Sequence, residues 1–265
     1  MRPLHPSTHL LLALAAAAAL LPCAVAQHSN PLPDTPTVAE QYLLSAANQE
    51  RAARNLPLLH RDPLLARAAA QHAQAMAAHA SISHQIAGEP ALANRGASMG
   101  VAFSRISENV AEAPSAVQIH DMWMHSEGHR ANLLDPAVDA IGIRVIARNG
   151  ELYAVEDFAK TVPSVSLDEQ EFAIRALIAQ LGQIALTTAP DATSAARQTC
   201  SITTGFAGAR KPTFTMRFTS DSLTQLPGEL ITRLASGRYR QAAVGACTAK
   251  ESSFTSYNFA VLLYP

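Results

Sequence analysis

Apolar residues recur at helical spacing in two stretches of the first half of the chain. The first stretch begins near Val38 and ends before Pro57, where proline breaks the pattern. The second begins at Asp62-Pro63, an N-cap residue followed by proline at the first helical position, and continues to Ala80. Apolar residues every three or four positions give a helix one buried face, so the pattern predicts two amphipathic helices.

The pattern changes after this second helix. We expect a loop over residues 88–100. Two short helices should follow, over residues 116–123 and 129–134, with a break at Gly128. A β-hairpin is expected over residues 140–158. The hairpin is predicted by alternating apolar and polar residues on both sides of Asn149-Gly150. This dipeptide suits a two-residue turn because both of its positions need positive φ.

A second region follows Pro163. Ser166 and Glu169 have the spacing of a capping box, and an apolar helical stripe runs from there to Gly182. Alternation typical of strands returns at residues 214–218 and 257–263. We therefore expect a small α+β module over residues 163–265, and nothing in its sequence indicates catalysis.

The first 26 residues have the pattern of a secretory signal. A basic end is followed by twelve apolar residues, LLLALAAAAALL, and by the small-residue motif AVA before Gln27. Because a membrane-spanning helix needs about 20 apolar residues, we expect export without a transmembrane anchor. Cleavage after Ala26 removes Cys23 and leaves Cys200 and Cys247, which we expect to form one disulfide in an oxidising compartment.

Charge and length narrow the function classes. The chain has 20 Lys and Arg against 21 Asp and Glu, without a basic block, so nucleic acid is not an expected partner. The proline-rich residues 27–37 predict a linker between the signal and the first domain. The sequence thus divides into a signal peptide (1–26), a linker (27–37), a first domain (38–162) and the C-terminal module (163–265).

The stretch WMHSEGHRANLL contains two histidines and an acid in the pattern H-x-E-x-H, formed by His125, Glu127 and His129. Zinc proteases place the glutamate directly after the first histidine, on an unbroken helix, so that both rings share a face. Here Gly128 interrupts the helix and the glutamate is displaced by one position. The local motif therefore does not predict a zinc protease. Ser126 has His129 three residues later, but no third residue is evident that would complete a nucleophile system.

Six motifs occur in order along residues 38–159. They are NQERAARNLPLLHRDPLLARAAAQHAQAMA, SISH, ANRG, ISENVAEA, MWMHSEGHRANLL, and DAIGIRV followed by YAVEDF. Together they resemble the CAP superfamily, which comprises the cysteine-rich secretory, antigen 5 and pathogenesis-related 1 proteins, in its bacterial SCP-like branch. The resemblance implies an α-β-α sandwich with a central cleft where histidines and acids converge.

Carried onto this chain, the resemblance implies that His84, Glu108 and His129 converge in the cleft. Where other branches of the family place a second acid, this chain has Ser126, with Glu127 beside it, which weakens the metal prediction. Two neutral imidazoles and a carboxylate from separate segments suit zinc or another divalent metal. Two alternatives remain open: Glu108 hydrogen-bonds an imidazole instead of the metal, or both histidines are scaffold residues.

Four other residues near these motifs have structural interpretations. We expect Asn109 to bond backbone in a buried turn beside the cleft and Trp123 to anchor the core. We expect His72 to be a packed or hydrogen-bonded core residue and Arg130 to tie its helix to neighbouring loops.

The resulting hypothesis is a secreted CAP-domain protein, extracellular or periplasmic, that acts by binding. Its ligand is a lipid or small apolar molecule, or a cell-wall or protein partner, with an optional divalent metal in the cleft. The alternative is a metal-dependent extracellular hydrolase that uses Glu108 as base and His84 with His129 as ligands. No other cofactor is expected.

Overall fold

The computed structural model describes residues 35–181, 185–186, 190–248 and 253–265. The predicted signal peptide, 1–26, and the first part of the predicted linker lie outside the described residues. Within the described residues, no helix is long and apolar enough to cross a membrane.

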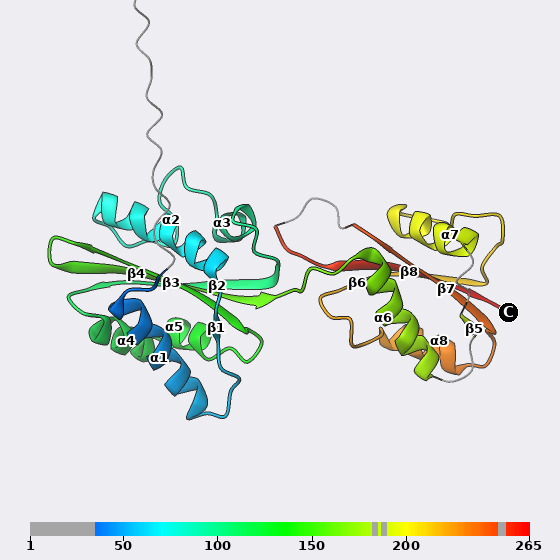
Figure 1. Ribbon diagram of the computed structural model, residues 1–265, viewed down its shortest axis with the longest axis horizontal. Helices are drawn as coiled ribbons and strands as arrows, with labels where there is room; N and C mark the ends of the chain where they lie inside the picture. The colour runs from blue at the N-terminus through cyan, green and yellow to red at the C-terminus, as the bar shows by residue number, and fades with distance from the viewer. Residues whose placement is uncertain (1–34, 182–184, 187–189, 249–252) are drawn as a thin grey trace, which may run out of the picture. The chain divides into compact units, whose positions relative to one another are not determined.

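The first domain is a three-layer α-β-α sandwich, as expected. Its elements are α1 (Val38–Ala52), β1 (His60–Arg61), α2 (Pro63–His79), α3 (Leu92–Ser98), β2 (Phe103–Ala113), α4 (Ala116–His125), α5 (Glu127–Leu133), β3 (Ala140–Arg148) and β4 (Glu151–Thr161). The sheet order is β1-β3-β4-β2, with β1 parallel to β3 and the other pairs antiparallel. Helices α2 and α3 cover one face, and α1, α4 and α5 cover the other (Figure 1).

Local sequence signals place several of these elements. The Asp62 carboxylate accepts hydrogen bonds from the amides of Leu64 and Leu65, both at 2.8 Å, and so caps α2. Asn149 and Gly150 have φ of 53° and 87°, which is the geometry of the predicted hairpin turn between β3 and β4. The predicted helices beginning at Val38 and Pro63 and the predicted hairpin are therefore confirmed.

Two predictions about the middle of the domain are wrong. Residues 88–100 are not a continuous loop, because Leu92–Ser98 form α3, a helix of two turns that is too short to show periodicity. The two helices that follow do not break at Gly128, which lies inside α5. The break is at Ser126, which is extended with φ −94° and ψ 123° and serves as the C-cap of α4 and the N-cap of α5.

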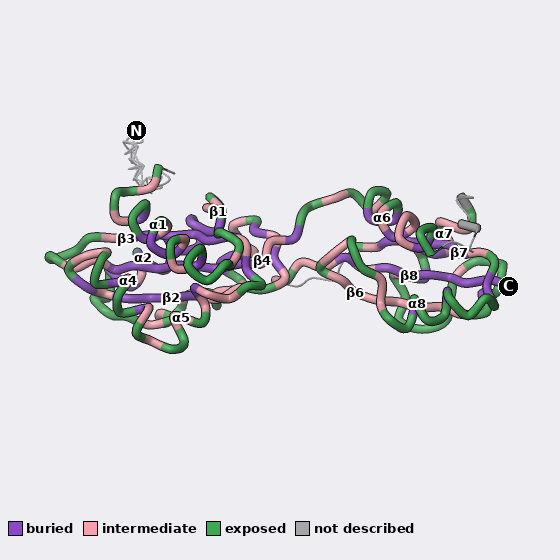
Figure 2. The backbone as a smooth tube through the Cα atoms, turned by 90° about the horizontal axis from the view of Figure 1, so that it is seen from below, coloured by how far each residue is buried: buried purple, intermediate pink, exposed green. Residues whose placement is uncertain are grey.

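The C-terminal module is α+β, as expected. Its elements are α6 (Leu167–Gln180), β5 (Ala185–Leu186), α7 (Pro190–Ser201), β6 (Phe214–Ser220), α8 (Gly228–Ala235), β7 (Gln241–Cys247) and β8 (Tyr257–Tyr264). Ser166 and Glu169 form the predicted capping box at the start of α6. Strand β8 is buried along most of its length and forms the centre of the module (Figure 2).

The second module repeats the topology of the first domain in reduced form. Its sheet order is β5-β7-β8-β6, again with a parallel first pair and antiparallel neighbours. Helices α6 and α8 pack on one face and α7 on the other (Figure 1), in the positions that α1, α4 and α2 have in the first sheet. The helices without a counterpart are α3 and α5. This internal repeat was not predicted from the sequence.

Close helix–sheet contact is built in the same way in both sheets. Gly142 on β3 lies against the backbone of α2, and Gly245 on β7 lies against the backbone of α7. In each case the helix presents alanine at the contact, Ala66 and Ala196, both fully buried. Small residues on both sides allow the backbones to approach.

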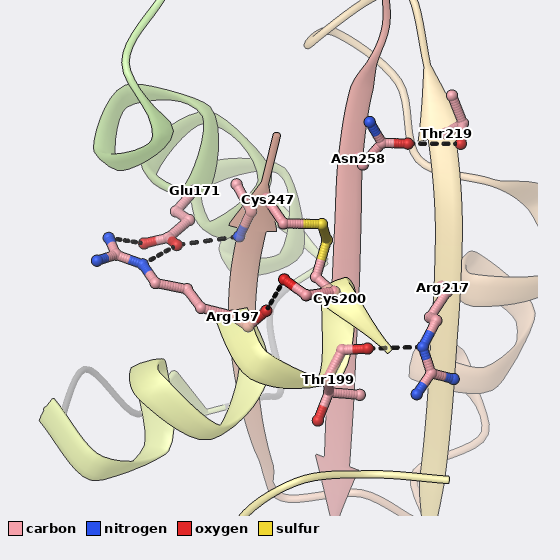
Figure 3. Close-up of a disulfide and its surroundings, with 10 residues drawn as sticks. Glu171, Arg197, Thr199, Cys200, Arg217, Thr219, Cys247 and Asn258 are labelled. Carbon is pink, nitrogen blue, oxygen red and sulfur yellow. Dashed lines mark hydrogen bonds and ion pairs between the residues drawn. A yellow bond between two sulfur atoms is a disulfide. The ribbon is translucent and has the colours of Figure 1, made fainter. Parts of the chain in front are cut away.

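A disulfide and a buried acid connect the layers of the second module (Figure 3). Cys200, in the last turn of α7, is bonded to Cys247 at the end of β7, as predicted. Glu171 on α6 accepts a hydrogen bond from the Ala246 amide at 3.0 Å and pairs with Arg197 of α7 at 2.6 Å. In the first domain, Glu40 of α1 likewise accepts from the Val145 amide at 3.0 Å.

Candidate functional site

The first predicted site residue, His84, lies in the loop between α2 and α3. Its side chain is 63% exposed, and its Nδ1 lies 3.0 Å from Oε1 of Glu108. Glu108 is in the middle of β2 and is 5% exposed. The structure therefore brings together two predicted residues that are separated by 24 positions in the chain.

A buried guanidinium holds the other side of the Glu108 carboxylate. Oε2 of Glu108 accepts from Arg95 of α3, a residue with no exposed surface. Opposite Glu108 on the neighbouring strand lies Asp157, which is also fully buried. Burial and then the negative charge of Glu108 raise the pKa of Asp157 well above its ordinary value, which favours the protonated form of Asp157 beside the Glu108–Arg95 pair.

The second histidine, His129, approaches from α5. The rings of His84 and His129 have centroids 6.3 Å apart and planes inclined at 45°. Burial and then the proximity of His84 lower the pKa of His129, which favours the neutral, metal-binding form of the ring. The structure thus places all three predicted residues, His84, Glu108 and His129, at one site.

Asparagine side chains fix the helix that contains His129. Nδ2 of Asn109 donates to the His129 carbonyl at 3.0 Å, and Nδ2 of Asn132 donates to the Glu108 carbonyl at 3.1 Å. Asn109 bonds backbone as expected, but it lies in β2 and not in a turn. The strand was missed because its centre contains buried polar residues instead of the alternation that predicts a strand.

The donor set fits two metal-binding histidines better than a three-ligand site. A zinc ion held by two imidazole nitrogens in tetrahedral geometry places the ring centres about 5 Å apart. The centroids of the His84 and His129 rings are 6.3 Å apart, which is wider than this spacing. Among the residues that the structure describes, no group of three or more His, Cys, Asp or Glu side chains is arranged to hold a metal. Both Glu108 oxygens already contact His84 and Arg95.

The remaining candidates, Ser126 and Glu127, lie at the start of α5, the helix that contains His129. Ser126 is half-buried at the junction of α4 and α5, and Glu127 is exposed. Together with Arg105, Arg130 and Asn132, Glu127 lines a hollow of about 520 Å³ on the α5 side.

Of two further expectations for this region, that of Trp123 as a core anchor is confirmed, while Arg130 bonds a residue of a helix and not of a loop. Arg130 donates to the Met124 carbonyl at 2.8 Å and so ties α5 to α4. Trp123 is fully buried, and its indole donates to the Val110 carbonyl at 3.1 Å.

Sequence reasoning missed the buried groups behind the cleft. Arg95 and Asp157 lie within the motifs ANRG and YAVEDF, but neither was assigned a contact with Glu108. Glu156, next to Asp157, is fully buried, and burial raises its pKa well above the ordinary value, with the Asn109 amide as an opposing influence. The available signal was the pair of acids between the apolar segments 152–155 and 158–159 of β4.

Comparison with known proteins identifies the family of the first domain. Residues 44–158 match the model of the cysteine-rich secretory protein family, CAP. The first domain belongs to this family. The protein YkwD of Bacillus subtilis, described as uncharacterized, is 26% identical over 141 residues, which cover 52% of this chain and 54% of that protein. The relationship places the CAP domain in the bacterial branch, and the chain spans about half the length of this curated relative.

Solved structures with a similar domain include bacterial proteins. An extracellular protein containing an SCP domain from Bacillus anthracis is 29% identical, with a TM-score of 0.43, over 46% of this chain and 40% of that one. An outer surface protein from Borrelia burgdorferi is 22% identical, with a TM-score of 0.44, over 46% of this chain and 92% of that one.

Proposed function

We propose that this protein is exported and acts by binding an extracellular ligand, with His84 and His129 of the CAP domain holding a divalent metal ion such as zinc. The observation that supports the proposal most directly is the pairing of two histidine rings from separate segments above one buried carboxylate. In this proposal Glu108 hydrogen-bonds His84 and is not itself a ligand of the metal. Its contact with Nδ1 fixes the ring and leaves Nε2 as the ligating nitrogen.

The metal, when bound, supplies a positive centre that can coordinate an oxygen of the ligand. The protein groups around it determine what that ligand is. A hollow on the α5 side, which His84 and His129 do not line, contains two arginines, Arg105 and Arg130, and the carboxylates of Glu127 and Asp135. Charged lining of this kind favours a polar partner, such as a cell-wall component or a protein, over a lipid.

The contacts and the burial of the Glu108 carboxylate support a binding function better than hydrolysis. A general base must be accessible to the group whose proton it abstracts, and Glu108 is only 5% exposed. Both oxygens of Glu108 are engaged, one by His84 and the other by the buried Arg95. This arrangement suits a group that orients an imidazole.

Calorimetric titration with Zn²⁺ tests the metal proposal. His84→Ala and His129→Ala are each expected to abolish binding, because each removes one of the two nitrogen ligands. His125→Ala is the matched control, since His125 is exposed and its Nδ1 bonds the Asp121 carbonyl at 2.8 Å. Ser126→Glu is expected to tighten binding by adding a carboxylate beside the pair.

Two results of the titration would contradict the proposal. Absence of zinc binding by the parent protein near neutral pH would show that both histidines are structural residues and not metal ligands. Binding lost only in His125→Ala would assign the metal to the local H-x-E-x-H motif instead.

A further inference from the structure

His84 is held in place although most of its own side chain is exposed. It lies in the histidine loop, which we define as residues 81–90, between the end of α2 and the start of α3. Most residues of this loop are exposed, and its hydrogen bond to Glu108 is the contact through which the His84 side chain reaches the sheet. An exposed loop of this kind samples many conformations unless buried groups fix its backbone.

One such buried group is His72 of α2, which has no exposed surface. Its Nε2 lies 2.6 Å from the carbonyl oxygen of Ser83, the residue directly before His84. A carbonyl oxygen only accepts hydrogen bonds, so Nε2 of His72 is the donor. This bond fixes the peptide that joins Ser83 to His84.

The second nitrogen of His72 contacts the far end of the same loop. Nδ1 lies 2.7 Å from Oε2 of Glu89, and that oxygen also accepts from the Ile86 amide at 3.2 Å. The side chain of Gln85 donates to the Glu89 carbonyl at 2.8 Å. The contacts of His72 with Ser83 and Glu89 therefore hold the histidine loop at both ends, and we call these contacts the clasp. Between them, Ile86 packs against apolar residues of α2.

We propose that His72 is a positioning residue for the metal site: with Glu89 it holds the histidine loop so that His84 meets Glu108 and faces His129. This inference rests on the proposed metal-binding function. It gives a role to a histidine that touches neither the metal nor the ligand. The same ring lies 3.8 Å from Oε2 of Glu108, so the clasp and the cleft share one buried polar cluster.

The test compares three variants of the full protein. His72→Leu removes both hydrogen bonds. His72→Gln keeps an amide donor near the position of Nε2 and is the conservative rescue. His79→Leu is the matched control, because His79 lies on the same helix seven residues later and is exposed. Each variant is first checked for a cooperative unfolding transition.

Hydrogen–deuterium exchange of residues 81–90, followed by mass spectrometry, measures the clasp without any metal. In His72→Leu we expect exchange in this loop to become about tenfold faster, the factor given by losing one net hydrogen bond that keeps the loop closed. His72→Gln should restore much of the protection, and His79→Leu should match the parent. If the loop of folded His72→Leu is as protected as in the parent, the clasp is overturned.

Zinc affinity measures the consequence for the site. Changes in groups that orient ligands typically lower metal affinity by about 10–100-fold, and we expect a loss in this range for His72→Leu with partial recovery in His72→Gln. A purely structural role would lower the melting temperature but leave the affinity unchanged, and that result would overturn the positioning role. If the parent itself binds no zinc, the proposed function fails, while the exchange experiment still decides whether the clasp exists.

Discussion

Replacing Gly142 with alanine should destabilise the CAP domain far more than the addition of one methyl group suggests. Gly142 lies on β3 where α2 crosses the sheet. A Cβ atom there would lie 2.2 Å from the carbonyl carbon of Leu65 and 2.4 Å from the amide nitrogen of Ala66. Both atoms are helix backbone, so no side-chain rotation can relieve the clash.

The size of the effect follows from this geometry. Carbon atoms pack at about 3.5–4.0 Å, so α2 must move away from β3 by about 1 Å or more. Overpacking a core typically costs about 1–3 kcal/mol, and a clash with backbone lies at the upper end of that range. We expect Gly142→Ala to lose about 3 kcal/mol of unfolding free energy and to lower the melting temperature by about 10 °C. Because His72 is on α2, zinc affinity should fall as well.

Urea and thermal unfolding, followed by circular dichroism, measure this loss. Gly128→Ala is the control, because a Cβ at this helical position meets nothing within 4 Å, and its stability should stay unchanged or rise by up to about 1 kcal/mol. Gly245→Ala should show a similar loss in the second module, where the new Cβ would lie 2.2 Å from the backbone of both Ala196 and Arg197. A Gly142→Ala protein with the unfolding midpoint of the parent would refute the reasoning.

Two further predictions concern the disulfide and the buried acid of β4. Replacing both Cys200 and Cys247 with serine should destabilise the second module by about 4 kcal/mol in the chain-entropy estimate, because α7 is no longer bonded to β7. Chemical denaturation measures this loss, and a double variant as stable as the parent would contradict the prediction. Glu156→Gln should be close to neutral in stability below the ordinary pKa of 4.5, where the parent carboxyl is protonated in both the folded and the unfolded state. It should become more stable than the parent as pH rises, because burial raises the pKa of the native carboxyl and so favours its protonated form. The parent loses stability as pH rises above the ordinary pKa of 4.5 toward the raised folded value, and this loss should diminish in the variant; unchanged pH dependence would show that Glu156 does not cause it.

The sequence by itself determined features that depend on neighbouring residues. The cap at Asp62, the capping box at Ser166 and the turn at Asn149-Gly150 are all present, because backbone hydrogen bonding and φ preferences act over a few residues. The two cysteines after the signal could be paired by count alone, and they form the disulfide. The convergence of His84, Glu108 and His129 was also predicted, but only through resemblance to a family.

Only the tertiary structure decided which groups surround those three residues. Arg95 and Asp157 meet Glu108 because a short helix and the antiparallel register of β2 with β4 place them there, and neither follows from local spacing. The strand β2 escaped prediction for the same reason: its buried polar residues are stabilised by partners distant in the chain. The repeat of the first topology in the second module is likewise a property of strand order. Strand order depends on which hydrophobic faces pack together, and residues distant in sequence settle that packing.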